Sequence, residues 1–176
     1  DALAAYVTSL DKVHASPHRK QDGGLTDDGL RGLKVFRQKG CPKCHGGPDL
    51  TDSATGELHD VGTLKPESGK RLGGPLTGLD SPTLRGIWET APYLHDGSAA
   101  TLEEVLTVQD PTGKHIGPLS DDERRWLVAY LSQIDHHDDE GVDPDALLDE
   151  GGCGCRMGAR GQTGWLGLLI AVLAIG

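Results

Sequence analysis

The stretch that decides the fold is Cys41-Pro42-Lys43-Cys44-His45. Cys-x-x-Cys-His is the motif through which a c-type haem is attached covalently to a protein. Two thiols at this spacing can add to the two vinyl groups on one edge of the porphyrin, and the imidazole beside the second thiol is then placed to bind the iron. The motif therefore predicts a haem c held by thioethers at Cys41 and Cys44, with His45 as the proximal iron ligand.

Two other interpretations of this pentapeptide are a redox Cys-x-x-Cys pair and half of a zinc site. A zinc site needs further Cys or His ligands at suitable spacing, and the remaining cysteines, Cys153 and Cys155, lie far away near the C-terminus. A redox pair of the thioredoxin type is expected in a βαβ context, and the sequence does not predict one. The haem interpretation is therefore preferred.

The composition also favours a domain built around a cofactor. The chain has 176 residues, enough for one domain, and its aromatic residues make up only 4%. Because large apolar side chains are scarce, a buried porphyrin would supply apolar surface that the core lacks. The net charge of -10 argues against a nucleic-acid partner and permits a small basic redox protein as electron donor, although a solvated acidic surface explains it as well.

Helices are predicted on both sides of the motif. Leu30, Leu33 and Phe36 share one face of a helix expected from Thr26 to about Lys39. Toward the C-terminus, a second apolar stripe predicts a helix that ends near residue 134. Its members are Trp126, Leu127, Tyr130, Leu131 and Ile134.

Further signals complete the domain. Thr101 with Glu104 and Ser120 with Glu123 are capping-box patterns, each of which predicts a helix start. Residues 46–80 contain eight glycines and predict a long irregular loop that wraps the haem edge. No segment alternates with the period of a strand. We therefore predict an all-α, cytochrome c-like domain over residues 26–135 with long irregular loops.

A repeat links the start of the chain to the end of this domain. Residues 3–11 (LAAYVTSLD) parallel residues 127–135 (LVAYLSQID), with Leu, Ala, Tyr and Asp coinciding at a constant offset. Because the later copy closes a haem domain, residues 1–11 are interpreted as the last helix of a preceding, missing haem domain, with chance similarity as the alternative. Residues 12–25 are then the linker between two haem domains of one protein.

The C-terminal region is predicted to leave the domain. Residues 136–152 are strongly acidic and predict a solvated linker. Residues 153–176 begin with a Gly/Cys motif and end in an apolar run of about twelve residues, too short to span a bilayer. This tail resembles the C-terminal sorting segment of myxobacterial surface proteins, without the usual basic cluster. The resemblance implies processing or lipid anchoring at Cys153 or Cys155; a cysteine pair on a floppy tail is the alternative.

A second constellation carries a more specific resemblance. Thr83-Leu84-Arg85-Gly86 and Ala91-Pro92-Tyr93-Leu94-His95-Asp96-Gly97, together with the haem motif and His59-Asp60-Val61-Gly62-Thr63, resemble the C-terminal domain of the bacterial di-haem cytochrome c peroxidase family. The relatives of that family include the methylamine-utilisation di-haem enzymes. The similarity covers residues 24–135. It implies an electron-transfer haem domain of an oxidoreductase that reduces hydrogen peroxide. Covalent haem attachment takes place outside the cytoplasm, so we expect a periplasmic or cell-surface protein.

The resemblance also implies roles for single residues. The backbone carbonyls of Thr90 and Pro92 match positions that help to bind calcium between two haem domains. His95 matches a histidine close to the haem, and it is the candidate catalytic residue because it could polarise a ligand or bond a propionate. A structural hydrogen bond is the alternative for His95.

Two further residues are candidates for contact with the haem. Arg85 could pair with a propionate, since a buried charge needs a partner; a solvated arginine is the alternative. Trp88 could pack on the porphyrin or lie on an electron path to the missing haem, and plain packing is the alternative.

The sequence departs from the family at the sixth iron position. The peroxidases place Met there and the methylamine-utilisation enzymes Tyr, whereas the matching residue here is Gln109, a poor iron ligand. Three interpretations stay open: His115 as distal ligand, which we prefer, an open site that admits peroxide, or ligation by His59 or His95. Six-coordinate iron favours a non-catalytic electron carrier or surface haem module, and an open site favours peroxidase chemistry at this haem.

Overall fold

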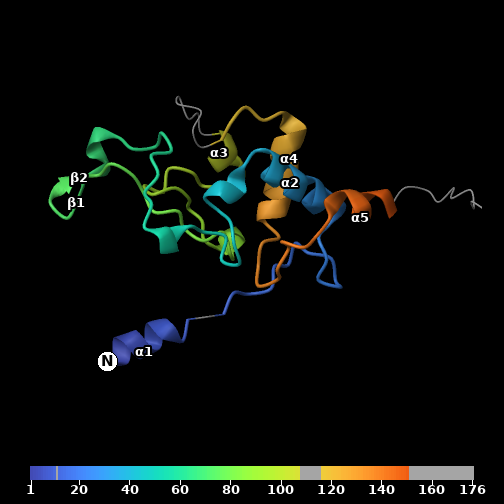
Figure 1. Ribbon diagram of the computed structural model, residues 1–176, viewed down its shortest axis with the longest axis horizontal. Coiled ribbons are helices and arrows are strands. Elements are labelled where there is room, and N and C mark those ends of the chain that lie inside the picture. Colours follow the sequence, from blue (N-terminus) through green and yellow to red (C-terminus); the bar gives the residue numbers. More distant parts are fainter. Residues whose placement is uncertain (11, 108–115, 151–176) are drawn as a thin grey trace, which may run out of the picture.

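The computed structural model describes residues 1–10, 12–107 and 116–150 (Figure 1). Within them the helices are α1 (Ala2–Thr8), α2 (Asp27–Gln38), α3 (Leu102–Thr107), α4 (Asp121–Leu131) and α5 (Pro144–Glu150). The irregular stretches carry the 3-10 turns η1 (Cys41–Lys43), η2 (Ser53–Thr55), η3 (Pro66–Ser68) and η4 (Ile87–Glu89), and an antiparallel hairpin of β1 (Lys70–Arg71) and β2 (Gly74–Pro75). The regular secondary structure is thus mostly helical and is joined by long loops, as predicted, but the small hairpin departs from a purely all-α class.

The domain is organised by the crossing of α2 and α4, seen at the centre of Figure 1. At the crossing, a Cβ on Gly32 would lie 2.0 Å from the backbone oxygen of Trp126 and 2.6 Å from the Cβ of Tyr130. Only a glycine lets the two backbones approach this closely. The predicted apolar stripes meet here. Trp126 is only partly buried, but the other members lie with flanking residues in one buried core: Leu25, Leu30, Leu33, Val35, Phe36, Leu84, Leu102, Leu127, Tyr130, Leu131 and Ile134.

The predicted helix starts are confirmed by their caps. Thr26 caps α2, with its Oγ1 accepting a hydrogen bond from the backbone N–H of Gly29 at 3.1 Å. Ser120 and Glu123 form both bonds of a capping box at the start of α4. These local contacts satisfy backbone donors that the first turn of a helix leaves unpaired.

The segment between α1 and α2, which we predicted as a linker, is docked on the end of α4. The side chains of Arg19 and Asp135 are almost fully buried and pair at 3.2 Å, while Arg19 also contacts Asp139 at 2.6 Å. Asp135 accepts a further hydrogen bond from the backbone N–H of Ser16 at 2.8 Å. The buried ion pair therefore joins residues 12–25 to the body of the domain.

Replacing Asp135 should weaken the fold in a pH-dependent way. Burial raises the pKa of Asp135, but hydrogen bonds from His137 and Ser16 outweigh it and the net pKa is lowered. Because the folded-state pKa lies below the unfolded value of about 3.9, the stabilisation is complete well above that pH and is lost as pH falls through the lowered pKa. We expect Asp135→Asn to lower the free energy of unfolding by about 2 kcal/mol at neutral pH.

Urea unfolding across the acid range checks this expectation. Asp149→Asn, which changes an exposed carboxylate on α5, is the matched control. It should leave the loss of unfolding free energy at acid pH unchanged. An Asp135→Asn chain that loses stability in acid as steeply as the wild type would contradict the assignment.

The repeated sequence adopts two different environments. In α4, Leu127 and Tyr130 are 2% and 3% exposed, whereas their counterparts in α1, Leu3 and Tyr6, are 68% and 62% exposed. Figure 1 shows α1 standing apart from the body of the domain. Among the described residues, α1 therefore presents an apolar face that is left in solvent.

The acidic segment after α4 differs from the predicted solvated linker. Helix α5 lies within residues 136–152 and packs beside α2. Arg37 of α2 donates hydrogen bonds to the backbone carbonyls of Asp139 and Val142, and Lys34 pairs with Asp145 at 2.5 Å. Basic residues on α2 thus hold the acidic chain, a tertiary effect that the charge pattern did not reveal.

The predicted sorting tail, residues 153–176, lies outside the described residues. In the part of the chain that the structure describes, no helix combines the length and the apolar character needed to cross a bilayer.

Candidate haem site

The haem-attachment motif forms a tight turn directly after α2. Gly40 allows the turn because it adopts the left-handed conformation with φ 78°. The backbone N–H groups of Cys44 and His45 both bond to the carbonyl of Cys41, at 3.3 and 2.9 Å. Both cysteines are free thiols and partly buried. The turn therefore brings two cysteine sulfurs and one imidazole together, as attachment of a single porphyrin requires.

The imidazole of His45 is oriented by the backbone. Its Nδ1 lies 3.3 Å from the carbonyl oxygen of Leu50, so Nδ1 carries the proton and Nε2 is the nitrogen left to bind iron. Metal-binding histidines usually donate their second N–H in this way. Burial lowers the pKa of His45, opposed by the carbonyls of Leu50 and Pro82, which favours the neutral imidazole that an iron ligand must be.

The residues present fit a covalently bound haem. The donor set of two thiols and a neutral imidazole matches the attachment chemistry. In addition, the indole N–H of Trp88 and the hydroxyl of Thr63 are buried, and neither has a hydrogen-bond partner among the described residues. Buried donors of this kind are costly when unsatisfied, and carboxylate groups such as haem propionates are suitable acceptors.

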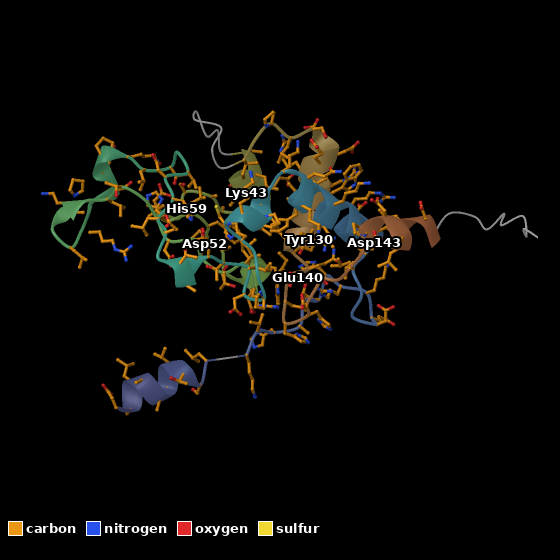
Figure 2. The ribbon with its side chains drawn as sticks, viewed as in Figure 1. Lys43, Asp52, His59, Tyr130, Glu140 and Asp143 are labelled. Atoms are coloured by element: carbon orange, nitrogen blue, oxygen red, sulfur yellow. The ribbon has the colours of Figure 1, made fainter. Side chains whose placement is uncertain are left out.

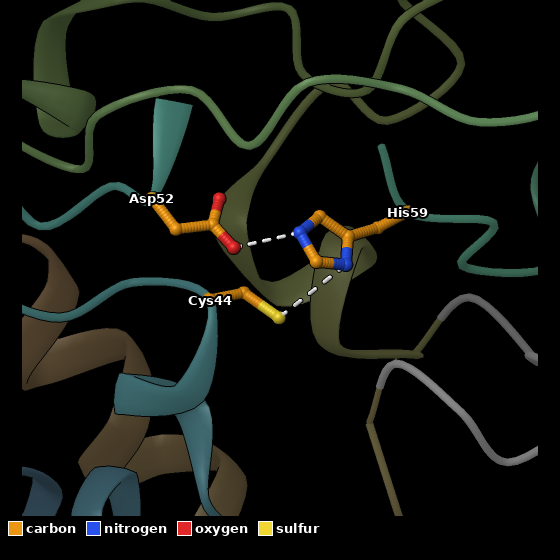
Figure 3. A group of neighbouring side chains, drawn as sticks. All are labelled: Cys44, Asp52 and His59. Atoms are coloured by element: carbon orange, nitrogen blue, oxygen red, sulfur yellow. Dashed lines mark hydrogen bonds and ion pairs between the residues drawn. The ribbon is translucent and has the colours of Figure 1, made fainter. Parts of the chain in front are cut away.

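A second histidine lies at the sulfur of Cys44 (Figure 3). The Nδ1 of His59 is 3.8 Å from the Sγ of Cys44, and its Nε2 is 2.7 Å from the Oδ2 of Asp52. Burial raises the pKa of Asp52, but hydrogen bonds from His59 and Ser81 outweigh it and lower the net value. Figure 2 shows Asp52 and His59 among the loops on the hairpin side of the molecule.

His59 was predicted only as an alternative iron ligand, and Asp52 was not among the predicted site residues. The available signal was the presence of His59 in a segment shared with the family. Its contact with Asp52 and Cys44 could not be inferred from spacing, because it is made by the irregular loop over residues 46–80.

The guanidinium of Arg85 donates its hydrogen bonds to backbone carbonyls. It donates from Nε to Pro48 at 2.6 Å and from Nη1 to Asp135 and His137 at 2.5 and 3.2 Å. It thereby ties the loop after the haem motif to the end of α4. Its predicted bond to a haem propionate stays a prediction.

Trp88 lies in η4, partly buried, with its ring edge-on to His18 at 6.2 Å between centroids. The inter-helix segment that carries His18 therefore passes over the turn that carries Trp88. Packing of Trp88 on the porphyrin and an electron path through it both stay predictions.

The remaining site candidates lie at the surface or beyond the described residues. His95 is exposed, with Nε2 3.0 Å from the hydroxyl of Ser68, and its catalytic role stays a prediction. Thr90 and Pro92 are also exposed, and calcium binding by their carbonyls stays a prediction. Gln109 and His115, at and near the sixth iron position, lie outside the described residues.

Comparison with known proteins places this site in a defined group. A family model described as RoxA-like, cytochrome c-like matches residues 78–112. The chain is 32% identical over 171 residues to hydrazine synthase subunit gamma of Kuenenia stuttgartiensis, covering 76% of this chain and 48% of that protein. It is 31% identical over 151 residues to cytochrome c551 peroxidase of Nitrosomonas europaea, covering 76% and 44%.

A further relative and a solved structure point to the same group of haem proteins. Methylamine utilization protein MauG of Methylorubrum extorquens is 32% identical over 153 residues, covering 76% of this chain and 42% of that protein. A solved structure of Kuenenia stuttgartiensis hydrazine synthase superposes with a TM-score of 0.59 at 31% identity, covering 75% of this chain and 54% of that one. The chain spans about half the length of the relatives it matches. It is a cytochrome c-like haem domain homologous to the cytochrome c peroxidases, MauG and hydrazine synthase subunit gamma.

Proposed function

We propose that this chain is the electron-transfer domain of a larger di-haem protein that reduces hydrogen peroxide. The observation that carries the proposal is the turn at Cys41, Cys44 and His45, in which the carbonyl of Leu50 engages Nδ1 of the imidazole, so that Nε2 would be free to hold an iron. When bound, the haem supplies the one-electron chemistry. The chain's own residues anchor it, provide the axial nitrogen and limit access to the iron.

The second haem is proposed to lie in a preceding domain of the same polypeptide. The repeat of residues 3–11 and 127–135 supports it. The later copy is buried against α2, whereas the earlier copy has an apolar face that no other described residues cover. The coverage of about half of each relative also supports it. A calcium ion at the carbonyls of Thr90 and Pro92, between the two domains, belongs to the same proposal.

The proposed location is the periplasm or the cell surface, with a small redox protein as electron donor. The kinship with cytochrome c peroxidases supports the periplasm. Lipid anchoring through the tail at 153–176 is part of the proposal. The functional test is turnover of hydrogen peroxide by the full-length protein supplied with a reduced small cytochrome or copper protein; a full-length protein with both haems that consumes no peroxide would favour the electron-carrier alternative.

The distal ligand is proposed to be His115. Among the described residues, the other two candidates are engaged elsewhere, since His59 bonds to Asp52 and His95 contacts Ser68. We expect the ferric chain to give a low-spin absorption spectrum that cyanide leaves unchanged, because two imidazoles fill both axial positions. His115→Gln should give a high-spin spectrum that shifts when cyanide is added.

His14→Gln is the control for this measurement, because His14 is exposed and pairs with Glu89. It should leave the low-spin spectrum intact. A wild-type chain that is already high-spin and responds to cyanide or peroxide would refute ligation by His115 and place peroxide chemistry at this haem.

A further inference from the structure

The loop over residues 46–80 holds Cys44, His59 and Asp52 in a chain of contacts (Figure 3). The Sγ of Cys44, a ring nitrogen of His59 and an oxygen of Asp52 all lie within 4.8 Å of one another. The backbone of His59 is fixed by reciprocal hydrogen bonds with Leu79 at 2.8 and 2.9 Å. A Cβ on Gly78 would lie 2.9 Å from the backbone of Leu58, so this isolated bridge also needs its glycine. The imidazole is therefore held in place.

The contacts of the His59 ring with Asp52 and Cys44 determine which of its two nitrogens carries the proton. An ionised carboxylate only accepts hydrogen bonds, so Nε2 of His59 carries a proton and donates it to Asp52 at 2.7 Å. In the neutral ring the other nitrogen, Nδ1, then has a free lone pair, and it faces the sulfur of Cys44 at 3.8 Å. A lone pair suits a thiol, which can donate its S–H to it. It does not suit a thioether, which has no proton to offer.

The His59 ring is therefore placed to accept a proton from the Cys44 thiol. We infer that His59, held by Asp52, is the base that assists addition of the Cys44 thiol to a haem vinyl group. The inference rests on the proposed covalent haem and adds a role for residues that the attachment motif does not contain.

The step balances without an oxidant or reductant. Nδ1 of His59 accepts the proton of the Cys44 thiol, and the sulfur bonds to the vinyl carbon next to the porphyrin ring. The proton is delivered to the outer vinyl carbon, so the S–H bond and the C=C π bond are lost while one C–S and one C–H bond form. Asp52 stabilises the imidazolium during the transfer, as a carboxylate does behind a histidine base.

The inference predicts an effect at one thioether and not at the other. His59 contacts Cys44, whereas the hydrogen bonds found for its ring do not involve Cys41. In a host competent for cytochrome c maturation, His59→Gln should leave the Cys41 thioether intact and raise the ratio of free to haem-bound Cys44. We expect a rise of at least about tenfold, a fraction of the 10²–10⁴ that a positioned base can contribute.

Mass spectrometry after thiol alkylation measures the free Cys44, and the α-band of the pyridine haemochrome reports the remaining vinyl group. Asp52→Asn is the second variant: it preserves the shape of the side chain but lets an amide N–H face Nε2, which would leave a proton on Nδ1. It should act in the same direction. His14→Gln, which alters another histidine–carboxylate pair, should have no effect.

Each outcome decides between the possibilities. Unchanged Cys44 attachment in both His59→Gln and Asp52→Asn overturns the inference while leaving the haem domain intact. Equal loss at Cys41 and Cys44 also overturns it, because the pair would then serve folding or haem docking in general. Wild-type chains without any covalent haem would instead refute the proposed function.

Discussion

A chain in which Cys41 and Cys44 are both replaced by alanine will leave a cytochrome c-maturing host without covalent haem. The two thiols are the only cysteines on the turn after α2, and no other side chain there can form a thioether. We expect the fraction of chains that keep their pigment in acid acetone to fall from nearly all to none. Because His45 keeps its bond to Leu50, the variant chain can still bind haem reversibly through Nε2.

Two single variants sharpen this expectation. Cys41→Ala and Cys44→Ala should each keep one thioether and remain coloured after acid acetone, with a shifted haemochrome band. Replacement of Cys153 and Cys155, the remaining cysteines of the chain, should leave haem content unchanged. Covalent haem in the Cys41→Ala, Cys44→Ala chain would contradict the assignment of the site.

Gly32→Val should have the largest effect on stability among changes outside the haem motif. A Cβ at Gly32 would lie 2.0 Å from the carbonyl oxygen of Trp126, and backbone atoms cannot move aside as a flexible side chain can. The helices α2 and α4 must separate, which removes packing from Phe36 and Tyr130 at their interface. We expect the free energy of unfolding to fall by about 3 kcal/mol, the upper end of the range for overpacked cores.

Denaturant unfolding of the haem-loaded chain, followed by circular dichroism and by the haem absorption band, measures the loss. Gly141→Ala is the matched control, since Gly141 has open space around it and no positive φ. It should change stability by no more than about 0.5 kcal/mol. If Gly32→Val unfolded at the wild-type denaturant concentration, the close crossing of the two helices would be wrong.

The local elements were largely predictable because their causes are local. The spacing of Leu30, Leu33 and Phe36 predicted α2, and the pairing of Ser120 with Glu123 predicted the start of α4. Helix α5 was missed, because its stability depends on Arg37 and Lys34 of α2, which are distant in sequence. The hairpin of β1 and β2 was also missed, since strands of two residues show no alternation.

The candidate site likewise has features that the sequence predicts and features that depend on tertiary packing. Attachment at Cys41 and Cys44 and ligation by His45 are predictions from covalent spacing alone, so the sequence by itself was enough to predict the cofactor and the thioether positions. Only the tertiary structure decided what surrounds them: the Leu50 carbonyl at His45, the carbonyls that occupy Arg85, and the pair of Asp52 and His59 at Cys44. The physical reason is that a motif fixes atoms a few bonds apart, whereas contacts between distant segments depend on how helices and loops pack.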